Sequence, residues 1–402
     1  MSDAAASAGG PRVLVVSRQH AHPPRNGGAL REMHIVRALA ALGPTWVFAL
    51  AAGGPRPPDL QVAGWTSSRD RNASMPEGGD VMAALRDGRS PFHVTVSETA
   101  ARELVALVDE FAPDVVVVRG NELATYVPHL RATGARLIVD ADYAFAEAIA
   151  TMGAGDSNRA RGITWRHAAS LVARVEAETV ALVDQIWVAH TESRDSLRAT
   201  YPDAPSITVV PNVVDVASYS PSPRTDPWHV VYPGRFDFWP NEDAAATLIN
   251  DVLPLLEQAS VSIVGMAPTP WMRDVTDPRV TVTGAVDDIR PYLCRAGVMA
   301  VPLHVGSGTR LKVLEAFAAS LPVVSTAKGV EGLGLVDREH YLNAETPAEF
   351  AAAIKTLARE PAPTNAIVTR AHALVDARYS LPALEESIKD ALAIAGVHPA
   401  TN

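Results

Sequence analysis

One segment of the chain combines the residue types that bind an anionic ligand. HVGSGTRLKVLEA, residues 304–316, follows an apolar run and contains Gly306 and Gly308. Glycines let backbone N–H groups approach a ligand closely, and the N-terminus of a helix adds partial positive charge. Arg310 and Lys312 bring two full charges to the same place. We therefore expect this segment to hold a diphosphate.

The same segment carries an acid behind the two cations. Glu315 lies three residues after Lys312, which is a neighbouring position on a helix, and a carboxylate there suits a ribose diol. Thr309 is the expected N-cap of a helix that continues to Ser320, with Leu314 on its buried face. The alternative is a solvated helix with an ordinary Lys–Glu pair.

Composition limits the kind of protein. A chain of 402 residues suits two or three domains, and a net charge of −10 argues against a general nucleic-acid binder. The single cysteine, Cys294, provides no disulfide framework and suits a reducing cytoplasm. The N-terminus lacks the pattern of a signal peptide, and no apolar run reaches the ~18 residues of a spanning helix. We expect a cytoplasmic protein without an integral membrane segment; peripheral membrane contact stays open.

Short apolar runs alternate with helical patterns along the whole chain. Such runs, apolar on both faces, indicate parallel sheets covered by helices, so the fold class is α/β. Strands are expected at 12–17, 46–52, 114–118, 135–141, 185–190 and 206–211, then at 229–234, 260–266, 279–284, 298–303 and 322–326. Helices are expected at 29–43, 97–111, 347–359 and 381–395, and residues 53–90 are interpreted as mostly loop.

The alternation is interrupted once, at SYSPSPRTDPW, which contains three prolines. This interruption divides the chain into two doubly wound halves, and a ligand cleft is expected between them at the carboxyl ends of the strands. The predicted divisions are an N-terminal domain at 1–218, a linker at 219–228, a C-terminal domain at 229–378 and a C-terminal helix at 379–402.

Several segments together resemble a known family. GSGTRLKVLEAFAASLPVVST (306–326) is similar to the donor site of retaining GT-B glycosyltransferases of family 4. PPRNGGALREMHIVRALAALG (23–43), VVPNVVD (209–215) and VVYPGRFDFWPNEDA (230–244) resemble other family segments in the same order. The resemblance implies two Rossmann-like domains, a nucleotide-sugar donor bound by the second, an acceptor bound by the first, and a C-terminal helix that returns to the first.

The resemblance also implies roles for individual residues. Arg235 would contact the donor diphosphate, Glu315 the ribose, and Gly27 and Gly28 would lie near the reacting centre. The donor-binding set is then Gly27, Gly28, Arg235, Gly306, Ser307, Gly308, Thr309, Arg310, Lys312, Leu314 and Glu315. The catalytic candidates are Arg235, Lys312, Asp140 and Asp142.

The sequence departs from the family at two positions. Ser307 stands where a glutamate often contacts the donor sugar, and Asn241 stands where many members carry a lysine. Lys312, together with Arg310, is our candidate for the second diphosphate cation. A branch of the family shows this Gly-Ser-Gly-Thr-Arg-x-Lys form, so we interpret the segment as a variant site.

Asp140 and Asp142 follow an apolar run and admit three interpretations. Two carboxylates one residue apart can hold Mn²⁺ or Mg²⁺ for a nucleotide-sugar, which would indicate the other, metal-dependent glycosyltransferase fold. Either residue can instead cap the following helix. We favour a place for one of them near the donor sugar, with no metal.

The expected function is hexosyltransferase-like: retaining, metal-independent transfer without a cofactor from a nucleotide-sugar to a small molecule, glycan or natural product. One alternative is a nucleotide-sugar epimerase on the same fold, which would need acid and base groups around the sugar. The other is a degenerate, non-catalytic nucleotide-binding or partner protein, which Ser307 and Asn241 favour.

Overall fold

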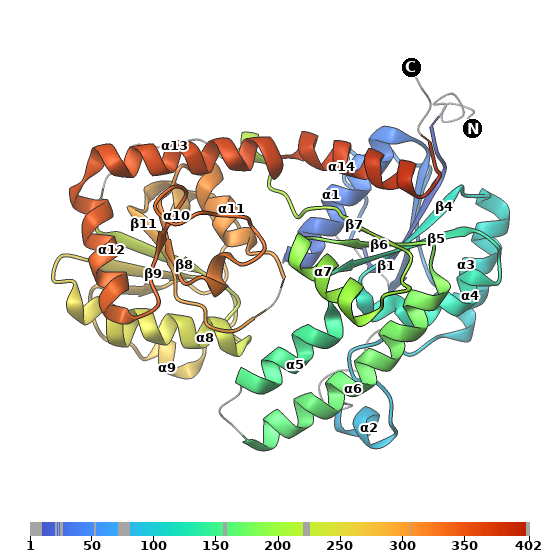
Figure 1. Cartoon of the computed structure of the whole chain (residues 1–402), viewed down its shortest axis with the longest axis horizontal. Coiled ribbons are helices and arrows are strands. Elements are labelled where there is room, and N and C mark those ends of the chain that lie inside the picture. The colour runs from blue at the N-terminus through green and yellow to red at the C-terminus, as the bar shows by residue number, and fades with distance from the viewer. Residues whose placement is uncertain are drawn as a thin grey trace. The chain divides into compact units, whose positions relative to one another are not determined.

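The chain forms two compact units, each built around a parallel sheet (Figure 1). The computed structural model describes residues 10–20, 22, 24, 27–51, 54–70, 81–155, 159–219, 226–306 and 308–398; Ser307 lies outside these ranges. By their contacts, residues 1–212 and 384–402 form unit 1, and residues 213–383 form unit 2.

Over the described residues, the sheet of unit 1 has seven strands in the order β3-β2-β1-β4-β5-β6-β7, and each strand is parallel to its neighbours. Its central strand β4 reads VVVVR and is buried along its whole length, as expected for a sheet covered on both faces. The strands are β1 Val13–Gln19, β2 Thr45–Ala51, β3 Gly64–Ser67, β4 Val115–Arg119, β5 Arg136–Asp142, β6 Gln185–Val188 and β7 Ser206–Val209.

Helices cover this sheet, and one pair extends away from it. The apolar side of α3 packs on the sheet, and the Ser97 hydroxyl caps the helix by accepting from the N–H of Ala100. Figure 1 shows α5 and α6 side by side, extending from the sheet. The α-helices are α1 Gly27–Leu42, α2 Val81–Arg86, α3 Glu98–Phe111, α4 Val127–Arg131, α5 Phe145–Gly155, α6 Arg159–Leu182, α7 Thr191–Thr200 and α14 Leu381–Ile394, with a 3₁₀ turn η1 at Asn121–Tyr126.

In the described part of unit 2, the sheet has six strands in the order β10-β9-β8-β11-β12-β13, again all parallel. The strands are β8 His229–Pro233, β9 Ser260–Val264, β10 Val280–Val282, β11 Val298–Val301, β12 Val323–Ser325 and β13 Leu342–Asn343. The α-helices are α8 Trp239–Ala246, α9 Pro270–Arg273, α10 Arg290–Arg295, α11 Leu311–Ala318, α12 Pro347–Arg359 and α13 Pro361–Arg378. Short helical turns are η2 Val216–Ser218, η3 Thr247–Val252, η4 Leu253–Leu255 and η5 Lys328–Val330.

The predicted α/β class, two Rossmann-like units with parallel sheets, is confirmed, but one region differs from the sequence prediction. Residues 53–90, interpreted as mostly loop, contribute the edge strand β3 and the helix α2. The strand β3 reads GWTS, too short to show a period, and its Gly64 packs directly against the indole of Trp46 in β2. The contact of Gly64 with Trp46, which no local sequence pattern reveals, thus places this strand at the edge of the sheet. The predicted domain limits stay predictions.

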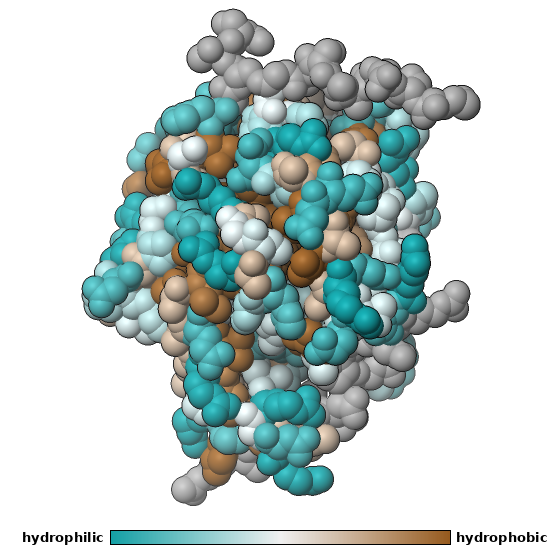
Figure 2. All heavy atoms as spheres, turned by 90° about the vertical axis from the view of Figure 1, so that its right-hand side faces the viewer, coloured by the Kyte–Doolittle hydropathy of each residue, from teal (hydrophilic) through white to brown (hydrophobic). Residues whose placement is uncertain are grey.

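Among the described residues, no helix is long and apolar enough to cross a membrane. Figure 2 shows one face of the molecule, on which apolar residues lie in patches between hydrophilic ones. Single exposed apolar side chains, such as Met82 and Ile163, are normal on protein surfaces and do not by themselves mark an interface.

A glycine at the end of β9 provides a test of the packing in unit 2. Gly265 has φ 141°, and a Cβ atom there would lie 1.9 Å from the carbonyl oxygen of Gly234. Gly284 also has positive φ, 69°, but a Cβ atom there would meet nothing within 4 Å. We expect Gly265→Ala to lower the free energy of unfolding by about 3 kcal/mol and Gly284→Ala by about 1 kcal/mol. Denaturant unfolding measures both; equal losses would contradict the close approach of the two backbones.

Candidate functional site

The glycine-rich segment after β11 forms a turn that leads into helix α11. Gly306 has φ 127° and Gly308 has φ 80°, a backbone region that favours glycine. The guanidinium of Arg310 is buried under this turn, where it donates to the carbonyl oxygens of Gly306 (2.9 Å) and Lys328 (3.3 Å). Arg310 therefore ties the turn to the segment that follows β12.

The start of α11 differs from the sequence prediction. Arg310, not Thr309, occupies the N-cap position, and the helix ends at Ala318 instead of Ser320. The backbone of Arg310, with φ −81° and ψ 68°, lies outside the helical region, so the first helical residue is Leu311. The hydroxyl of Thr309 is buried and has no hydrogen-bond partner among the described residues.

Lys312 is held by polar and aromatic groups of the neighbouring elements. Its ammonium donates to Oδ1 of Asn241 at 3.1 Å and lies 4.2 Å from the centre of the Tyr232 ring. Burial, together with the nearby charge of Arg310, lowers the pKa of Lys312 to about 7, although Glu315 acts in the opposite direction. At neutral pH the amine is thus close to losing its charge, and an anionic partner would stabilise the charged form.

Asn241 links Lys312 to the Gly-Arg segment after β8. Its Oδ1 also accepts from the hydroxyl of Tyr232 at 3.0 Å, and its Nδ2 donates to the carbonyl oxygen of Arg235 at 3.0 Å. The guanidinium of Arg235 itself forms a two-point ion pair with Asp237, with both contacts at 2.6 Å, and is more than half exposed. The structure thus brings Lys312, Asn241 and the backbone of Arg235 together.

Glu315 lies further along α11 and has a partner that the sequence analysis missed. Its Oε1 accepts from the hydroxyl of Tyr219 at 3.1 Å. Burial raises the pKa of Glu315 to about 7, while this hydrogen bond and the charge of Lys312 act in the opposite direction. Leu314, also predicted to bind the donor, has its side chain fully buried in the core of unit 2. No sequence signal marks Tyr219, because it lies within the proline-rich interruption, at the start of the predicted linker, and its role depends on packing.

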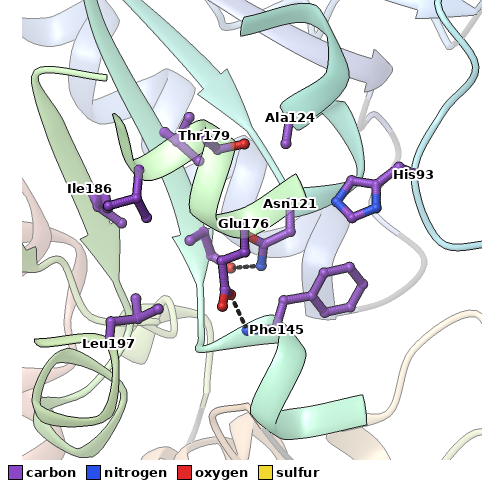
Figure 3. Close-up of a pocket in the computed structure, with 11 residues that line it drawn as sticks. His93, Asn121, Ala124, Phe145, Glu176, Thr179, Ile186 and Leu197 are labelled. Atoms are coloured by element: carbon purple, nitrogen blue, oxygen red, sulfur yellow. Dashed lines mark hydrogen bonds between the residues drawn. The ribbon is translucent and has the colours of Figure 1, made fainter. Parts of the chain in front are cut away.

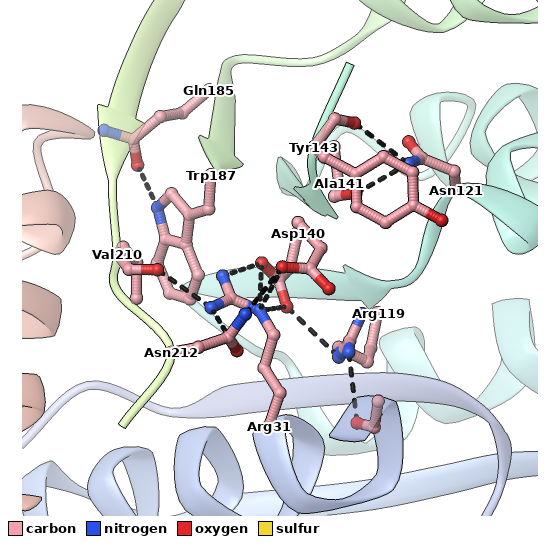
Figure 4. Close-up of polar contacts among 12 residues, drawn as sticks. Arg31, Arg119, Asn121, Asp140, Ala141, Tyr143, Gln185, Trp187, Val210 and Asn212 are labelled. Carbon is pink, nitrogen blue, oxygen red and sulfur yellow. Dashed lines mark hydrogen bonds and ion pairs between the residues drawn. The ribbon is translucent and has the colours of Figure 1, made fainter. Parts of the chain in front are cut away.

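Asp140 lies at the centre of a buried ion cluster in unit 1 (Figure 4). Its carboxylate accepts from Nε of Arg31 at 3.1 Å and pairs with Nε of Arg119 at 3.2 Å. Arg31 also donates to the carbonyl oxygen of Val210 at 2.9 Å and to Oδ1 of Asn212 at 3.0 Å. The cluster therefore joins α1, β4, β5 and the chain after β7.

Asp142 has a different environment. It has φ 64° at an irregularity in the pairing of β5 with β6, and its side chain is partly exposed. Nδ2 of Asn212 donates to its Oδ1 at 2.9 Å, while Arg31 is 3.9 Å away. Of the two predicted aspartates, Asp142 is therefore the one with access to a ligand.

The Gly-Gly segment of the sequence forms the first turn of α1. The helix begins at Gly27, and the carbonyl oxygen of Gly28 accepts from Nη2 of Arg119 at 3.1 Å. Next to this contact, burial raises the pKa of Glu32 to about 8, although the charge of Arg119 and a hydrogen bond with Ser17 act in the opposite direction. The ion cluster thus also holds the start of α1.

The metal interpretation of Asp140 and Asp142 meets a physical obstacle. Both oxygens of Asp140 already contact guanidinium groups, and a metal ion would have to displace a buried positive partner. Among the residues that the structure describes, no group of three His, Cys, Asp or Glu side chains gathers closely enough to hold a metal ion.

A cavity in unit 1 is too small for a sugar (Figure 3). Its volume of about 20 Å³ is enough for one water molecule. Its one carboxylate, Glu176, is occupied, because it accepts from the N–H of Phe145 at 2.9 Å and from the hydroxyl of Tyr201 at 3.1 Å. The lining residues are His93, Asn121, Ala124, Val139, Ala141, Phe145, Glu176, Thr179, Val180, Ile186 and Leu197.

Comparison with known proteins agrees with the fold. Residues 227–360 match the sequence model of a family described as "Glycosyl transferases group 1". No curated protein sequence matches the chain. The matched segment contains the turn before α11 and the Gly-Arg segment after β8.

Solved structures of low sequence identity share the GT-B fold of this chain. Sucrose-phosphate synthase from Thermosynechococcus elongatus is 17% identical, with a TM-score of 0.71 over 94% of this chain and 98% of the other. HepE from Anabaena, in complex with UDP and glucose, is 14% identical, with a TM-score of 0.68 over 95% and 99%. A glycosyltransferase from Rickettsia africae is 11% identical, with a TM-score of 0.63 over 96% and 98%.

The ion cluster around Asp140 predicts that a single substitution within it lowers the free energy of unfolding strongly. Asp140→Asn leaves two buried guanidinium groups without their counter-ion, so we expect the free energy of unfolding to fall by about 3–5 kcal/mol. Asp59→Asn is the matched control, because Asp59 pairs with Arg37 on the surface and such pairs contribute at most about 1 kcal/mol. Denaturant unfolding compares the two variants; a loss for Asp140→Asn as small as that for Asp59→Asn would refute the importance of the cluster.

Proposed function

We propose that the chain is a retaining, hexosyltransferase-like glycosyltransferase that moves a sugar from a nucleotide-sugar to an acceptor. One observation carries the proposal: the ammonium of Lys312 lies 3.1 Å from the side chain of Asn241. Asn241 occupies the position at which many members of the family that the chain resembles carry a lysine, so α11 brings a cation to the same place. The segment that matches the glycosyltransferase model, 227–360, contains both residues.

The diphosphate of the donor would bind against Lys312 and the turn at Gly306 and Gly308. Burial lowers the pKa of the Lys312 ammonium to about 7. A bound diphosphate would stabilise the charged form of this ammonium, because an opposite charge nearby favours ionisation. HepE, which is similar in fold, was solved with UDP-glucose, and this supports a nucleoside diphosphate sugar as the donor class.

Arg235 would contribute the second direct contact to the diphosphate. The ion pair of Arg235 with Asp237 is exposed and therefore contributes little to stability. A phosphate can replace the carboxylate of Asp237, because a guanidinium binds either group through two parallel hydrogen bonds. Arg310 would act without touching the ligand. Its N–H groups hold the backbone of the turn, and its buried charge adds to the positive electrostatic potential at the diphosphate.

Transfer breaks the bond between the anomeric carbon and the diphosphate, and negative charge grows on the leaving group. Cations that are already in place stabilise this charge more strongly in the transition state than in the ground state, which speeds the reaction. Protein cations would do this work, so the proposed reaction needs neither a metal ion nor a cofactor. In unit 1, the resemblance gives Asp142, Gly27 and Gly28 as the candidate residues for the sugar, and the acceptor would bind this unit.

The first test is ligand binding. We expect UDP, ADP or GDP to raise the midpoint of thermal unfolding of the native chain, because a ligand that binds only the native state stabilises it. Lys312→Ala removes the main cation and should weaken the affinity for the diphosphate by roughly tenfold or more. Lys389→Ala, which changes a surface lysine paired with Glu386 on α14, is the control and should bind as the native chain does. Equal binding by Lys312→Ala would refute the diphosphate assignment.

The second test is turnover. With a nucleotide-sugar that binds and a panel of acceptors, we expect release of the nucleoside diphosphate in the presence of a chelator, and a product whose anomeric configuration, read by NMR, equals that of the donor. Loss of activity on chelation with recovery on Mn²⁺ would contradict the metal-independent proposal. Binding without turnover would favour the non-catalytic alternative, and a changed donor sugar without an acceptor would favour an epimerase.

The pKa of Lys312 leads to a pH prediction. Below pH 7 the amine is charged before the ligand arrives; above pH 7 it must first take up a proton, so its contribution to binding falls as the pH rises. Inorganic pyrophosphate is the probe, because it has no ribose to contact Glu315. The affinity ratio of the native chain to Lys312→Ala, which cancels the titration of the ligand itself, should fall by up to roughly tenfold per pH unit above pH 7. Isothermal calorimetry measures this ratio, and a ratio that does not change with pH would contradict the lowered pKa of the amine.

A further inference from the structure

Tyr219 is the one tyrosine whose hydroxyl is seen to bond to a predicted ligand-binding carboxylate among the described residues. It donates to Oε1 of Glu315 at 3.1 Å, from a segment that precedes β8 by ten residues. Its ring is partly buried against the hydrophobic core of unit 2. The tyrosine is therefore anchored by packing at one end and bonded to the carboxylate at the other.

The segment that carries Tyr219 is itself held in place. The residues just before it form the turn η2, and the carbonyl oxygen of Ser218 accepts from Nη1 of Arg290 at 3.4 Å. Arg290 is in turn paired with Asp288 at 2.9 Å, next to the start of α10. The backbone that carries Tyr219 is thus held on its N-terminal side by η2 and by Arg290.

Glu315 needs such a partner if it is to act on a ligand. A carboxylate shielded from water tends to take up a proton, and without a bonding partner its orientation is not fixed. The hydrogen bond from Tyr219 favours the ionised form and selects one orientation, and it uses only one of the two oxygens. In the part of the chain that the structure describes, Oε2 of Glu315 has no hydrogen bond and is left to accept from a hydroxyl of the ligand.

We propose that Tyr219 is a positioning residue that holds Glu315 so that its second oxygen accepts a ribose hydroxyl, and that it thereby sets the preference for ribonucleotides over deoxyribonucleotides. The proposal rests on the proposed function, because it needs a nucleoside diphosphate in the site at α11. Loss of the Tyr219 hydroxyl leaves the ring and its packing in place. It should therefore change the recognition of the ribose and leave the recognition of the diphosphate unchanged.

The experiment compares ligands that differ by one hydroxyl or lack the ribose. UDP, 2′-deoxy-UDP, 3′-deoxy-UDP and inorganic pyrophosphate are titrated by calorimetry into the native chain, Tyr219→Phe and Glu315→Gln. We expect the native chain to prefer UDP over at least one deoxy analogue by roughly tenfold or more, as for a hydrogen bond to a charged group. Tyr219→Phe should reduce this preference to about threefold or less and leave the pyrophosphate affinity unchanged. Glu315→Gln should also reduce the preference.

A matched control separates positioning from stability. Tyr379→Phe removes a buried hydroxyl of the same unit, which donates to the carbonyl oxygen of Leu333 at 2.9 Å. It should lower the midpoint of thermal unfolding and keep the full preference for UDP. A second variant, Tyr219→Leu, should lose the preference as Tyr219→Phe does.

The outcomes distinguish the two proposals. If no nucleoside diphosphate binds the native chain, the proposed function fails and this inference fails with it. If UDP binds with a clear preference over its deoxy analogues and Tyr219→Phe keeps that preference, the inference is wrong and the proposed function stands. A preference reduced by Tyr219→Phe but not by Tyr379→Phe supports the positioning role.

Discussion

Some charged side chains near the carboxyl edges of the two parallel sheets are shielded from water, and each of these needs a partner. An unpaired buried charge costs several kcal/mol, so the chain around such a group has to supply compensation. In unit 1, Asp140 is compensated by Arg31 and Arg119, and the same contacts join the first helix to two strands and to the chain after β7. In unit 2, the charge of Lys312 is compensated by the side-chain oxygen of Asn241 and by the ring face of Tyr232.

The compensation of the Asp140 charge differs from that of the Lys312 charge, and this difference bears on function. The charge of Asp140 meets full counter-charges and is fully buried, which makes it a structural element of unit 1. Among the described residues, Lys312 has only neutral groups at bonding distance, so its charge is incompletely compensated, and burial with the nearby charge of Arg310 lowers its pKa to about 7. Glu315 is in a similar state, with a tyrosine hydroxyl as its partner and a pKa of about 7. Incompletely compensated charges beside a glycine turn are characteristic of a ligand site.

The comparison of Asp140 with Asp142 shows where sequence reasoning reaches its limit. The two residues are separated by one position and follow the same apolar run, so the sequence treats them alike. A change of backbone conformation at Asp142, with φ 64°, turns its side chain toward Asn212, while Asp140 stays within the ion cluster. The partners come from positions up to 109 residues away, and no local spacing encodes such a contact.

The sequence by itself determined the alternation of buried strands and helices and the glycine turn with its cations and acid, because these depend on local periodicity and on residue type. It also placed a strand before the Gly-Arg segment and another before the turn. Tertiary structure alone decided that Lys312 meets Asn241, that Tyr219 holds Glu315 and that Arg310 supports the turn from below. Hydrogen bonds of this kind join segments distant in sequence, and they form only when packing of the apolar strands has brought those segments together.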